Sequence, residues 1–508
     1  MTTGTNTGVG DRSGYAYTVD QVTEPFTAGR AAGPAVMIAG VAAGGVATVL
    51  LPNADRIGIG VTLSAAALAV PGLLSARRRG RADGRPFGRV NAATVAVAAG
   101  LLLIPTLRAA DWLAVLCLLA AAGLVAVVQL DVRRLAPIVL AGPLIAWAGL
   151  RTPGWVLTSV QEEVPSLPRP SGRAARAWAR GLLLGAVVVL VVGALLASAD
   201  VVFARLVDRL WPSVDVGQVP AYAITFVVTT GLALAGGYAG AHRVRRRWLA
   251  PTAGPDDQPR HPAEWLLPLV LAGVVLALFL VVQVTALFGG AAETVLREEG
   301  LTYADRARQG FGQLTVVTLI LVALLAWAGR AGAGHRRLLA AAGGPLLALI
   351  LLLAASALRR LWLYDDAYGW TVRRVNAAAF EIWLVVALLG LGVLWLTRRT
   401  GLAPRLVIGS AGAGLLCLAL VNPEAMVARA DVHRYEQSGY RAEAIDVEYL
   451  AALSADAAPA LSELPPAERQ LVLAHLRDSY ERLPDTWRTW NLARHHAQGV
   501  LAPGGSSS

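Results

Sequence analysis

The sequence contains no lysine, because all 45 of its basic residues are arginine. Reactions that need a lysine amine, such as Schiff-base formation or the phosphate contact of a Walker A loop, are therefore excluded. The chain has only two cysteines, Cys117 and Cys417, and each lies in an apolar run, where it is typical of a small buried side chain. The seven histidines lack zinc-ligand spacing such as HExxH. These absences lead us to expect no metal, no cofactor and no catalytic residue, and they weigh against an enzyme.

Alternating segments about ten residues long, which a membrane β-barrel requires, are also absent. Hydrophobic residues make up 56% of the chain, and many uncharged runs approach the ~20 residues that cross a ~30 Å hydrocarbon core as a helix. The apolar runs are Pro34–Leu51, Ile57–Leu74, Ala92–Leu107, Trp112–Leu130, Ala136–Val160, Gly181–Ala199, Ala221–Ala241, Leu266–Leu287, Leu314–Ala328, Leu338–Ala357, Phe380–Leu396 and Leu406–Val421. The sequence predicts an all-α fold, a polytopic transmembrane helical bundle of about 11–12 spans, since lipid offers the backbone no other partners.

The run from Ala136 to Val160 is an exception, because it is broken by three prolines and an arginine. These residues are Pro137, Pro143, Pro153 and Arg151. The basic segments on either side of this part of the chain require an even number of crossings, whereas three apolar runs lie between them. We favour a re-entrant pair of half-helices or a segment that does not cross the membrane, and a single kinked span is the alternative.

The arginines are unevenly distributed, and their positions predict the orientation in the membrane. From Asn422 to the end there are 8 arginines against 12 acidic residues, which leaves 37 arginines against 22 acids elsewhere. Clusters follow apolar runs at 77–85, 243–247, 330–337 and 398–405, and such connectors stay in the cytoplasm. The net charge of +11 thus points to lipid headgroups, and no nucleic-acid binding is expected. We expect a multi-pass protein of the bacterial cell (inner or plasma) membrane, with a cytoplasmic N-terminus and an extracytoplasmic C-terminus.

The same pattern divides the chain into three parts. Residues 1–31 are polar and rich in glycine and threonine, and we expect a disordered cytoplasmic tail. Residues 32–421 form the transmembrane helical domain, and residues 422–508 form a helical extracytoplasmic region. In the last part, helices should begin at Asn422-Pro423, Asp446 and Pro465-Pro466. A piece of this size folds alone only marginally, so it should dock on the outer face of the bundle.

One polar segment, "GLTYADRARQGFGQL" from Gly300 to Leu314, stands between two apolar runs. Thr302 and Asp305 have capping-box spacing, which predicts a helix that begins at Thr302 and leads into the next span. Its polar side chains are Tyr303, Asp305, Arg306 and Arg308. An interfacial amphipathic helix and a binding segment explain this pattern equally well.

A second polar segment runs from Arg359 to Trp383 and contains Tyr364, Asp365 and Tyr368. Its aromatic residues are typical of an interfacial belt, whereas its acids and arginines exceed what a belt needs. Arg374 and Glu381 lie seven apart and share a helix face if the helix begins near Thr371. We predict that they form an ion pair, and a purely structural link between helices is the competing interpretation.

We predict that these two segments and the C-terminal region form one extracytoplasmic polar cluster, because a net acidic region would dock onto arginine-rich neighbours. The members of this predicted polar cluster are Tyr303, Asp305, Arg306, Arg308, Tyr364, Asp365, Tyr368, Arg374, Glu381, Arg429, Asp431, Arg434, Asp446, Tyr449 and Asn491.

Long stretches of the sequence resemble a known family. The stretches are "LFGGAAETVLREEGLTYADRARQGFGQL", "ASALRRLWLYDDAYGWTVRRV", "NPEAMVARADVHR" and the terminal "WRTWNLAR". They are similar to the bacterial integral-membrane family catalogued as domain of unknown function 4153, or 4173, over residues 199–497. The resemblance implies a membrane protein with no established activity. Two positions depart from that pattern, since Arg306 stands where tyrosine is common and Asp431 stands where asparagine is usual.

Three functions stay open. We favour a non-enzymatic envelope protein whose outward loops and C-terminal region form a recognition surface for sensing or partner control. Besides the lipid bilayer, its partner would be an envelope protein or a small-molecule ligand. A secondary transporter would need polar groups inside the membrane, for which Glu381 and Gln283 are candidates. A membrane transferase acting on a lipid-linked substrate at the outer face would need an acidic site such as Asp365-Asp366.

Overall fold

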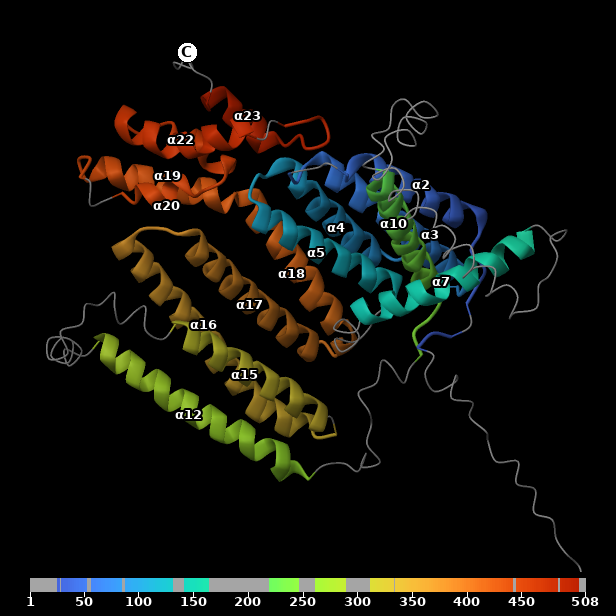
Figure 1. Cartoon of the computed structure of the whole chain (residues 1–508). Coiled ribbons are helices and arrows are strands. Elements are labelled where there is room, and N and C mark those ends of the chain that lie inside the picture. Colours follow the sequence, from blue (N-terminus) through green and yellow to red (C-terminus); the bar gives the residue numbers. More distant parts are fainter. Residues whose placement is uncertain are drawn as a thin grey trace, which may run out of the picture.

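The computed structural model shows an all-α architecture, as the sequence predicts. It describes residues 25–27, 29–52, 56–84, 87–130, 141–163, 219–245, 261–288, 311–332, 334–441, 445–482 and 485–501. Within these ranges every regular element is a helix, and an isolated β-bridge pairs Phe26 with Val244. The long apolar helices form two groups, and the short helices of the C-terminal region lie at one end of the bundle (Figure 1).

The first group of helices comes from the N-terminal half of the chain. It comprises α2 (Pro34–Leu50), α3 (Ile59–Ala82), α4 (Arg89–Leu107), α5 (Asp111–Gln129), α7 (Ala141–Glu163) and α10 (Val219–Ala241). Helix α10 packs against α2, α3 and α7, and α4 packs against α5. Small residues allow close contact, since a Cβ atom at Gly240 would lie 2.4 Å from the carbonyl oxygen of Gly72.

The second group follows in the C-terminal half. It comprises α12 (Pro262–Phe288), α15 (Phe311–Ala331), α16 (Arg336–Tyr368) and α17 (Val372–Leu396), which share one apolar core. Helix α18 (Ala403–Val421) packs against α17 on one side and against α4 and α5 on the other, so it joins the two groups (Figure 1).

The chain is a multi-pass integral membrane protein. Among the described residues, nine helices are long and apolar enough to cross a membrane: α3, α4, α5, α10, α12, α15, α16, α17 and α18. Large apolar side chains on them are widely exposed, including Val275 and Leu278 of α12 at 67% and 64%. Such exposure suits contact with lipid and would be costly in water.

The prediction of a re-entrant pair of half-helices was wrong for residues 141–163, and the non-crossing segment stays a prediction. Residues 141–163 form a single continuous helix, α7, with Pro153 inside it. Tertiary packing accounts for this, because α7 lies against α10 and buries Ala148 and Trp155 in a shared core. The apolar run at 181–199 lies outside the described residues.

The C-terminal region, defined here as residues 422–501, consists of short helices. They are α19 (Pro423–Gln437), α20 (Val447–Ala451), α21 (Ala458–Leu461), α22 (Pro466–Arg482) and α23 (Leu492–Leu501). The predicted helix starts are confirmed: the Asn422 side chain accepts from Ala425 N–H, and Asp446 accepts from Tyr449 N–H. Buried Leu450, Leu461 and neighbouring apolar residues give the region a core of its own.

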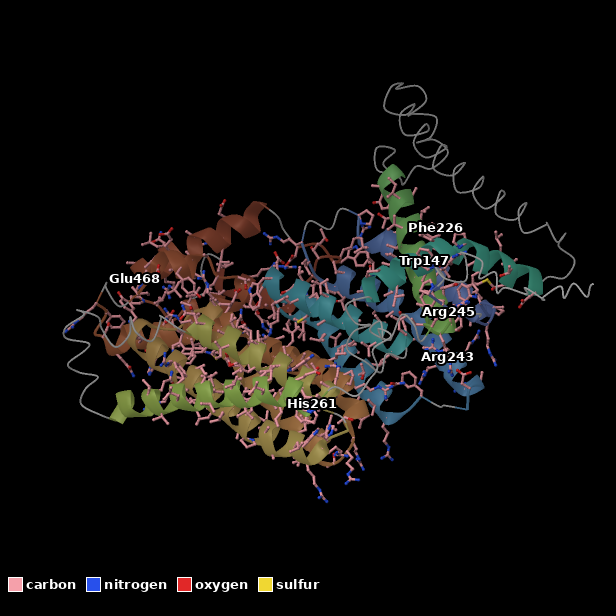
Figure 2. The ribbon with its side chains drawn as sticks, turned by 90° about the horizontal axis from the view of Figure 1, so that it is seen from below. Trp147, Phe226, Arg243, Arg245, His261 and Glu468 are labelled. Atoms are coloured by element: carbon pink, nitrogen blue, oxygen red, sulfur yellow. The ribbon has the colours of Figure 1, made fainter. Side chains whose placement is uncertain are left out.

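The basic connectors lie at the end of the helices that is far from the C-terminal region. Helix α3 begins beside this region, because the Ile59 N–H donates to the Trp490 carbonyl at 3.0 Å. Its 24 residues span about 36 Å and carry its last turn to the opposite end. There Asp83 pairs with Arg243 at 2.6 Å. Figure 2 shows Arg243 and Arg245 well separated from Glu468 of α22.

Candidate functional site

The structure brings five members of the predicted polar cluster together. Arg374, Asp431, Arg434, Asp446 and Tyr449 lie where the turn between α16 and α17 meets α19 and α20. Tyr303, Asp305, Arg306 and Arg308 lie outside the described residues. Tyr364, Asp365 and Tyr368 belong to the last turns of α16, and their side chains lie outside what the structure describes.

The turn between α16 and α17 is held by side chains of the C-terminal region. The Trp370 N–H donates to Asp431 Oδ1 at 3.3 Å, and the Val372 N–H donates to the Tyr449 hydroxyl at 2.9 Å. Val372 is the first residue of α17 and Trp370 lies just before the helix, so neither amide has an acceptor within α17. Asp446, in turn, orients Tyr449 by accepting its backbone N–H at 2.9 Å. We call this contact the turn junction.

Gly369 gives the turn junction its close fit. Its φ of +83° lies in the left-handed region, which favours glycine. A Cβ atom at this position would lie 2.4 Å from Arg434 Nη1 and 3.3 Å from Asp431 Oδ1. The Arg374 guanidinium donates to the Gly369 carbonyl, so two arginines flank this glycine.

The predicted ion pair between Arg374 and Glu381 is not formed. Glu381 is fully buried and accepts a hydrogen bond from Thr315 of α15 at 2.5 Å. The spacing of seven residues does place both side chains on one helix face. Arg374, however, turns back toward the carbonyl of Gly369. The backbone acceptor is nearer to the end of the helix, where a guanidinium remains close to solvent.

Burial changes the acidity of two groups at the turn junction. Desolvation raises the pKa of Asp431 from 3.8 to about 6, while the Trp370 N–H and the charges of Arg434 and Arg374 oppose the shift and Asp446 adds to it. Desolvation also raises the pKa of the Tyr449 phenol. Tyr449 therefore remains protonated at neutral pH, whereas Asp431 changes charge near neutrality.

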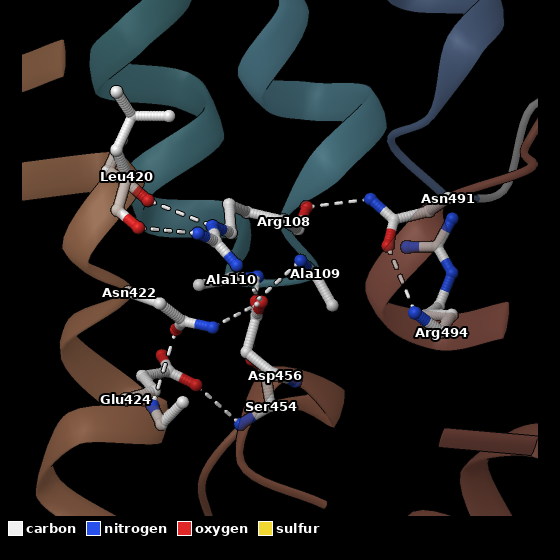
Figure 3. A network of polar contacts seen from close by, with 12 residues as sticks. Arg108, Ala109, Ala110, Leu420, Asn422, Glu424, Ser454, Asp456, Asn491 and Arg494 are labelled. Carbon is white, nitrogen blue, oxygen red and sulfur yellow. Dashed lines mark hydrogen bonds and ion pairs between the residues drawn. The ribbon is translucent and has the colours of Figure 1, made fainter. Parts of the chain in front are cut away.

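A second contact, which we call the connector junction, centres on Asp456 (Figure 3). Its carboxylate accepts the backbone N–H groups of Ala109 at 2.6 Å and Ala110 at 3.0 Å, in the connector between α4 and α5. Asn422 donates to its other oxygen at 3.2 Å, and Arg108 lies 3.8 Å away. Burial raises the pKa of Asp456, and the Ala109 amide and the Arg108 charge oppose this.

Arg108 and Glu424 extend the connector junction to α18. Arg108 donates to the carbonyls of Ala419 and Leu420, at 2.8 and 2.7 Å, and these carbonyls belong to the last turn of α18. A cation at this position also suits the negative end of the helix dipole. Glu424 is buried and accepts from Trp112 Nε1 at 2.9 Å and from the Ser454 N–H at 2.7 Å.

Asn491 belongs to the connector junction and not to the turn junction. Its side-chain amide donates to the carbonyls of Pro105 and Arg108, at 2.9 and 2.7 Å (Figure 3). Arg494 follows one turn later and pairs with Asp485 at 2.9 Å, with both side chains buried. Arg429 of α19 is exposed.

Sequence reasoning missed the connector junction. The short connector Arg108–Asp111 between two apolar runs gave no motif, and Glu424 and Asp456 entered only as part of the net acidic charge by which the C-terminal region was expected to dock. A usable signal was the placement of an arginine at the end of an apolar run, since such a residue needs acceptors close by. Within the described residues, no group of three or more His, Cys, Asp or Glu side chains is placed to hold a metal ion.

Comparison with known proteins places the chain in a family. The family model described as Domain of unknown function (DUF4153) matches residues 94–464. The chain belongs to this family. The match extends from α4 into the C-terminal region, so it covers the turn junction and most of the connector junction. No curated protein and no solved structure matches the chain.

Proposed function

We propose that the C-terminal region is an extracytoplasmic recognition surface of a bacterial cell-membrane protein, and that it acts in sensing or partner control and not in catalysis. The observation that carries the proposal is its attachment to both helix groups. Asp456 binds the connector of α4 and α5, whereas Asp431 and Tyr449 bind the turn before α17. The ligand would be an envelope protein or a small molecule.

Attachment at two points supports a role in signalling between the region and the membrane helices. A folded region with its own core moves as a unit, so a ligand that shifts it also shifts the ends of α4, α5 and α17. Such signalling requires two arrangements of the C-terminal region against the membrane helices. A ligand shifts the equilibrium between them only if it binds one more tightly than the other. The buried polar contacts of the connector junction and the part-buried ones of the turn junction would separate the two arrangements, because breaking them leaves desolvated groups without partners.

The orientation rests on the arginine-rich connectors, which lie at the opposite end of the helices from the C-terminal region. Under the positive-inside rule this end is cytoplasmic. Alkaline phosphatase fused at Ala458 should be active and phosphatase fused at Gly334 inactive. The reverse pair of results would overturn the extracytoplasmic assignment.

Coupling can be measured by pulsed electron spin resonance between the cytoplasmic ends of the two groups. Spin labels at Arg81 and Arg399, in a background without Cys117 and Cys417, report the distance from α3 to the end of α17. Removing the contacts of Asp456 and Tyr449 together should broaden the distance distribution, whereas Tyr440→Phe, at an exposed side chain, should leave it unchanged. An unchanged distribution in the first variant would show that the region does not control the helices.

Recognition itself can be tested in cells with a photo-crosslinking amino acid. Leu471 of α22 and Trp487 are exposed at 65% and 63% on the C-terminal region, and Arg81 at the other end of α3 is the control position. We expect a specific product or a ligand-dependent change in crosslinking at the first two positions. The same pattern at all three positions, or none at Leu471 and Trp487, would contradict the proposal.

Secondary transport is the second candidate. One observation favours it: Glu381 is a fully buried carboxyl inside the span α17. The transferase alternative depends on Asp365 and Asp366, and their side chains lie outside the described residues.

A further inference from the structure

Glu381 is a carboxyl group deep in a membrane helix, and only one of its two oxygens has a hydrogen-bond partner among the described residues. It lies nine residues into α17, about 14 Å from the first residue of the helix. Its exposed fraction is 0%. Oε1 accepts from Thr315 Oγ1 at 2.5 Å, whereas Oε2 has no hydrogen-bond partner among the described residues. Hydrocarbon offers no water to supply the missing donor.

The surroundings of Glu381 are apolar. Leu384, one turn along α17, and Leu314, next to Thr315, belong to one core cluster of the second helix group. The same cluster contains Leu280, one turn before Gln283 of α12. Gln283 is also buried; its Oε1 accepts from Ser356 at 2.8 Å, and in the part of the chain that the structure describes its Nε2 has no hydrogen-bond partner. A few polar side chains are therefore enclosed in an apolar core.

No charged group balances Glu381 within the described residues. The charged side chains that the structure describes on the helices packed around it are Glu264 on α12, Arg330 on α15, Arg336, Arg337, Arg359 and Arg360 on α16, Arg373 and Arg374 on α17, and Arg405 on α18. The side chains of Asp365 and Asp366, also on α16, lie outside what it describes. None of them forms an ion pair with Glu381, whose one contact is Thr315. An ionised carboxylate here would thus be held by a single hydroxyl.

Thr315 can serve both protonation states of Glu381. A hydroxyl has one hydrogen to donate and can also accept. When Glu381 is ionised, Thr315 donates to it. When Glu381 carries its proton on Oε1, the hydroxyl can accept a hydrogen bond from Oε1 and turn its own hydrogen to a carbonyl one turn back, as Thr318, Thr229 and Thr152 do.

We propose that Glu381 is an intramembrane proton-binding site that gains and releases one proton, with the Thr315 hydroxyl as its switching partner. The site goes beyond the recognition function of the C-terminal region and does not depend on it. A purely structural link between α15 and α17 would need no change of protonation. The state of Oε2 favours the proton site over the structural link. Within the described residues Oε2 has no donor, whereas a carboxylate that stayed ionised would need one on each oxygen.

Dicyclohexylcarbodiimide provides the test, since it reacts with protonated carboxyls in apolar surroundings. The carboxyl proton passes to a carbodiimide nitrogen while the carboxyl oxygen bonds to the central carbon, and the acyl group then moves to nitrogen. The product is a stable N-acylurea, formed without a leaving group or redox change. Peptide mass spectrometry of the full chain in lipid nanodiscs locates the adduct.

We expect an adduct at Glu381 that decreases about tenfold for each pH unit above a transition, following the protonated fraction. Glu424 is the internal control, because it is also buried, at 6% exposure, but both its oxygens have donors. It should remain unlabelled. Thr315→Val should change the pH of half-maximal labelling, whereas Thr318→Val should not, since the Thr318 hydroxyl bonds within its own helix.

Three results would overturn the proton site. Labelling of Glu381 that does not vary with pH would show a permanently neutral structural carboxyl. No labelling, together with no carbonyl band of a protonated carboxylic acid that Glu381→Gln removes from the infrared spectrum, would show a permanently ionised group. Loss of labelling on adding sodium at constant pH would show a metal-cation site. None of these readouts involves the C-terminal region, so failure here leaves the recognition function untouched.

Discussion

Asp431 should make the stability of this protein depend on pH. Its pKa is about 6 in the folded chain and 3.8 in its ordinary state. Between these values the folded chain keeps a proton that the unfolded chain has lost, so the free energy of unfolding decreases as the pH rises. The difference of roughly two pKa units corresponds to about 3 kcal/mol at most. Because Asp431 is partly exposed, we expect about 1 kcal/mol between about pH 5 and about pH 7.5.

Asp431→Asn is the perturbation that isolates this effect. Asparagine keeps an oxygen for the Trp370 N–H but does not titrate, and by family resemblance it is the usual residue at this position. The variant should lose this part of the pH dependence and should be at least as stable as the parent at about pH 7.5.

The assay is the apparent melting temperature in detergent, followed by intrinsic fluorescence of the 14 tryptophans. About 1 kcal/mol corresponds to a shift of roughly 1–2 °C in a chain of this length, since the shift per kcal/mol decreases with size. Glu463→Gln removes an exposed acid from the same region and is the control. Equal pH dependence in the parent and in Asp431→Asn would refute the reasoning.

Three further variants test the two junctions by the same melting assay. Gly369→Ala should destabilise the protein by about 2 kcal/mol or more, and the control Gly439→Ala by about 1 kcal/mol. Both glycines have positive φ, but only a Cβ atom at 369 would meet other atoms. Equal losses would exclude the steric argument. Tyr449→Phe should cost about 1 kcal/mol by removing the acceptor of an amide, and the exposed Tyr440→Phe should cost almost nothing; indistinguishable variants would mean that the turn amide finds another acceptor. Asp456→Asn should cost about 3 kcal/mol, because in either orientation its NH2 group faces a donor, either the two backbone amides or the Asn422 amide, and because it removes a charge next to Arg108; a loss within experimental error would show that the connector junction is not a stabilising contact.

The helical class of this protein and the positions of most of its described helices, with α7 as an exception, followed from the sequence alone. Runs such as Leu266–Leu287 have one stable form in lipid, since only a helix satisfies every backbone group within a single segment. The helix starts at Asn422 and Asp446 were equally predictable, because a capping side chain acts on amides two or three residues away. The predicted family was also confirmed by the match over residues 94–464.

Only the tertiary structure decided which polar groups meet. Asp456 binds amides 346 and 347 residues earlier in the chain, and no local pattern connects them. For Arg374, spacing correctly placed Glu381 on the same face, but the side chain had a nearer acceptor at Gly369 that spacing does not reveal. The partner of Glu381, Thr315, comes from another helix. Local periodicity determines which face of a helix is buried, whereas the partner of a buried polar group depends on how the helices pack, which is a property of the whole chain.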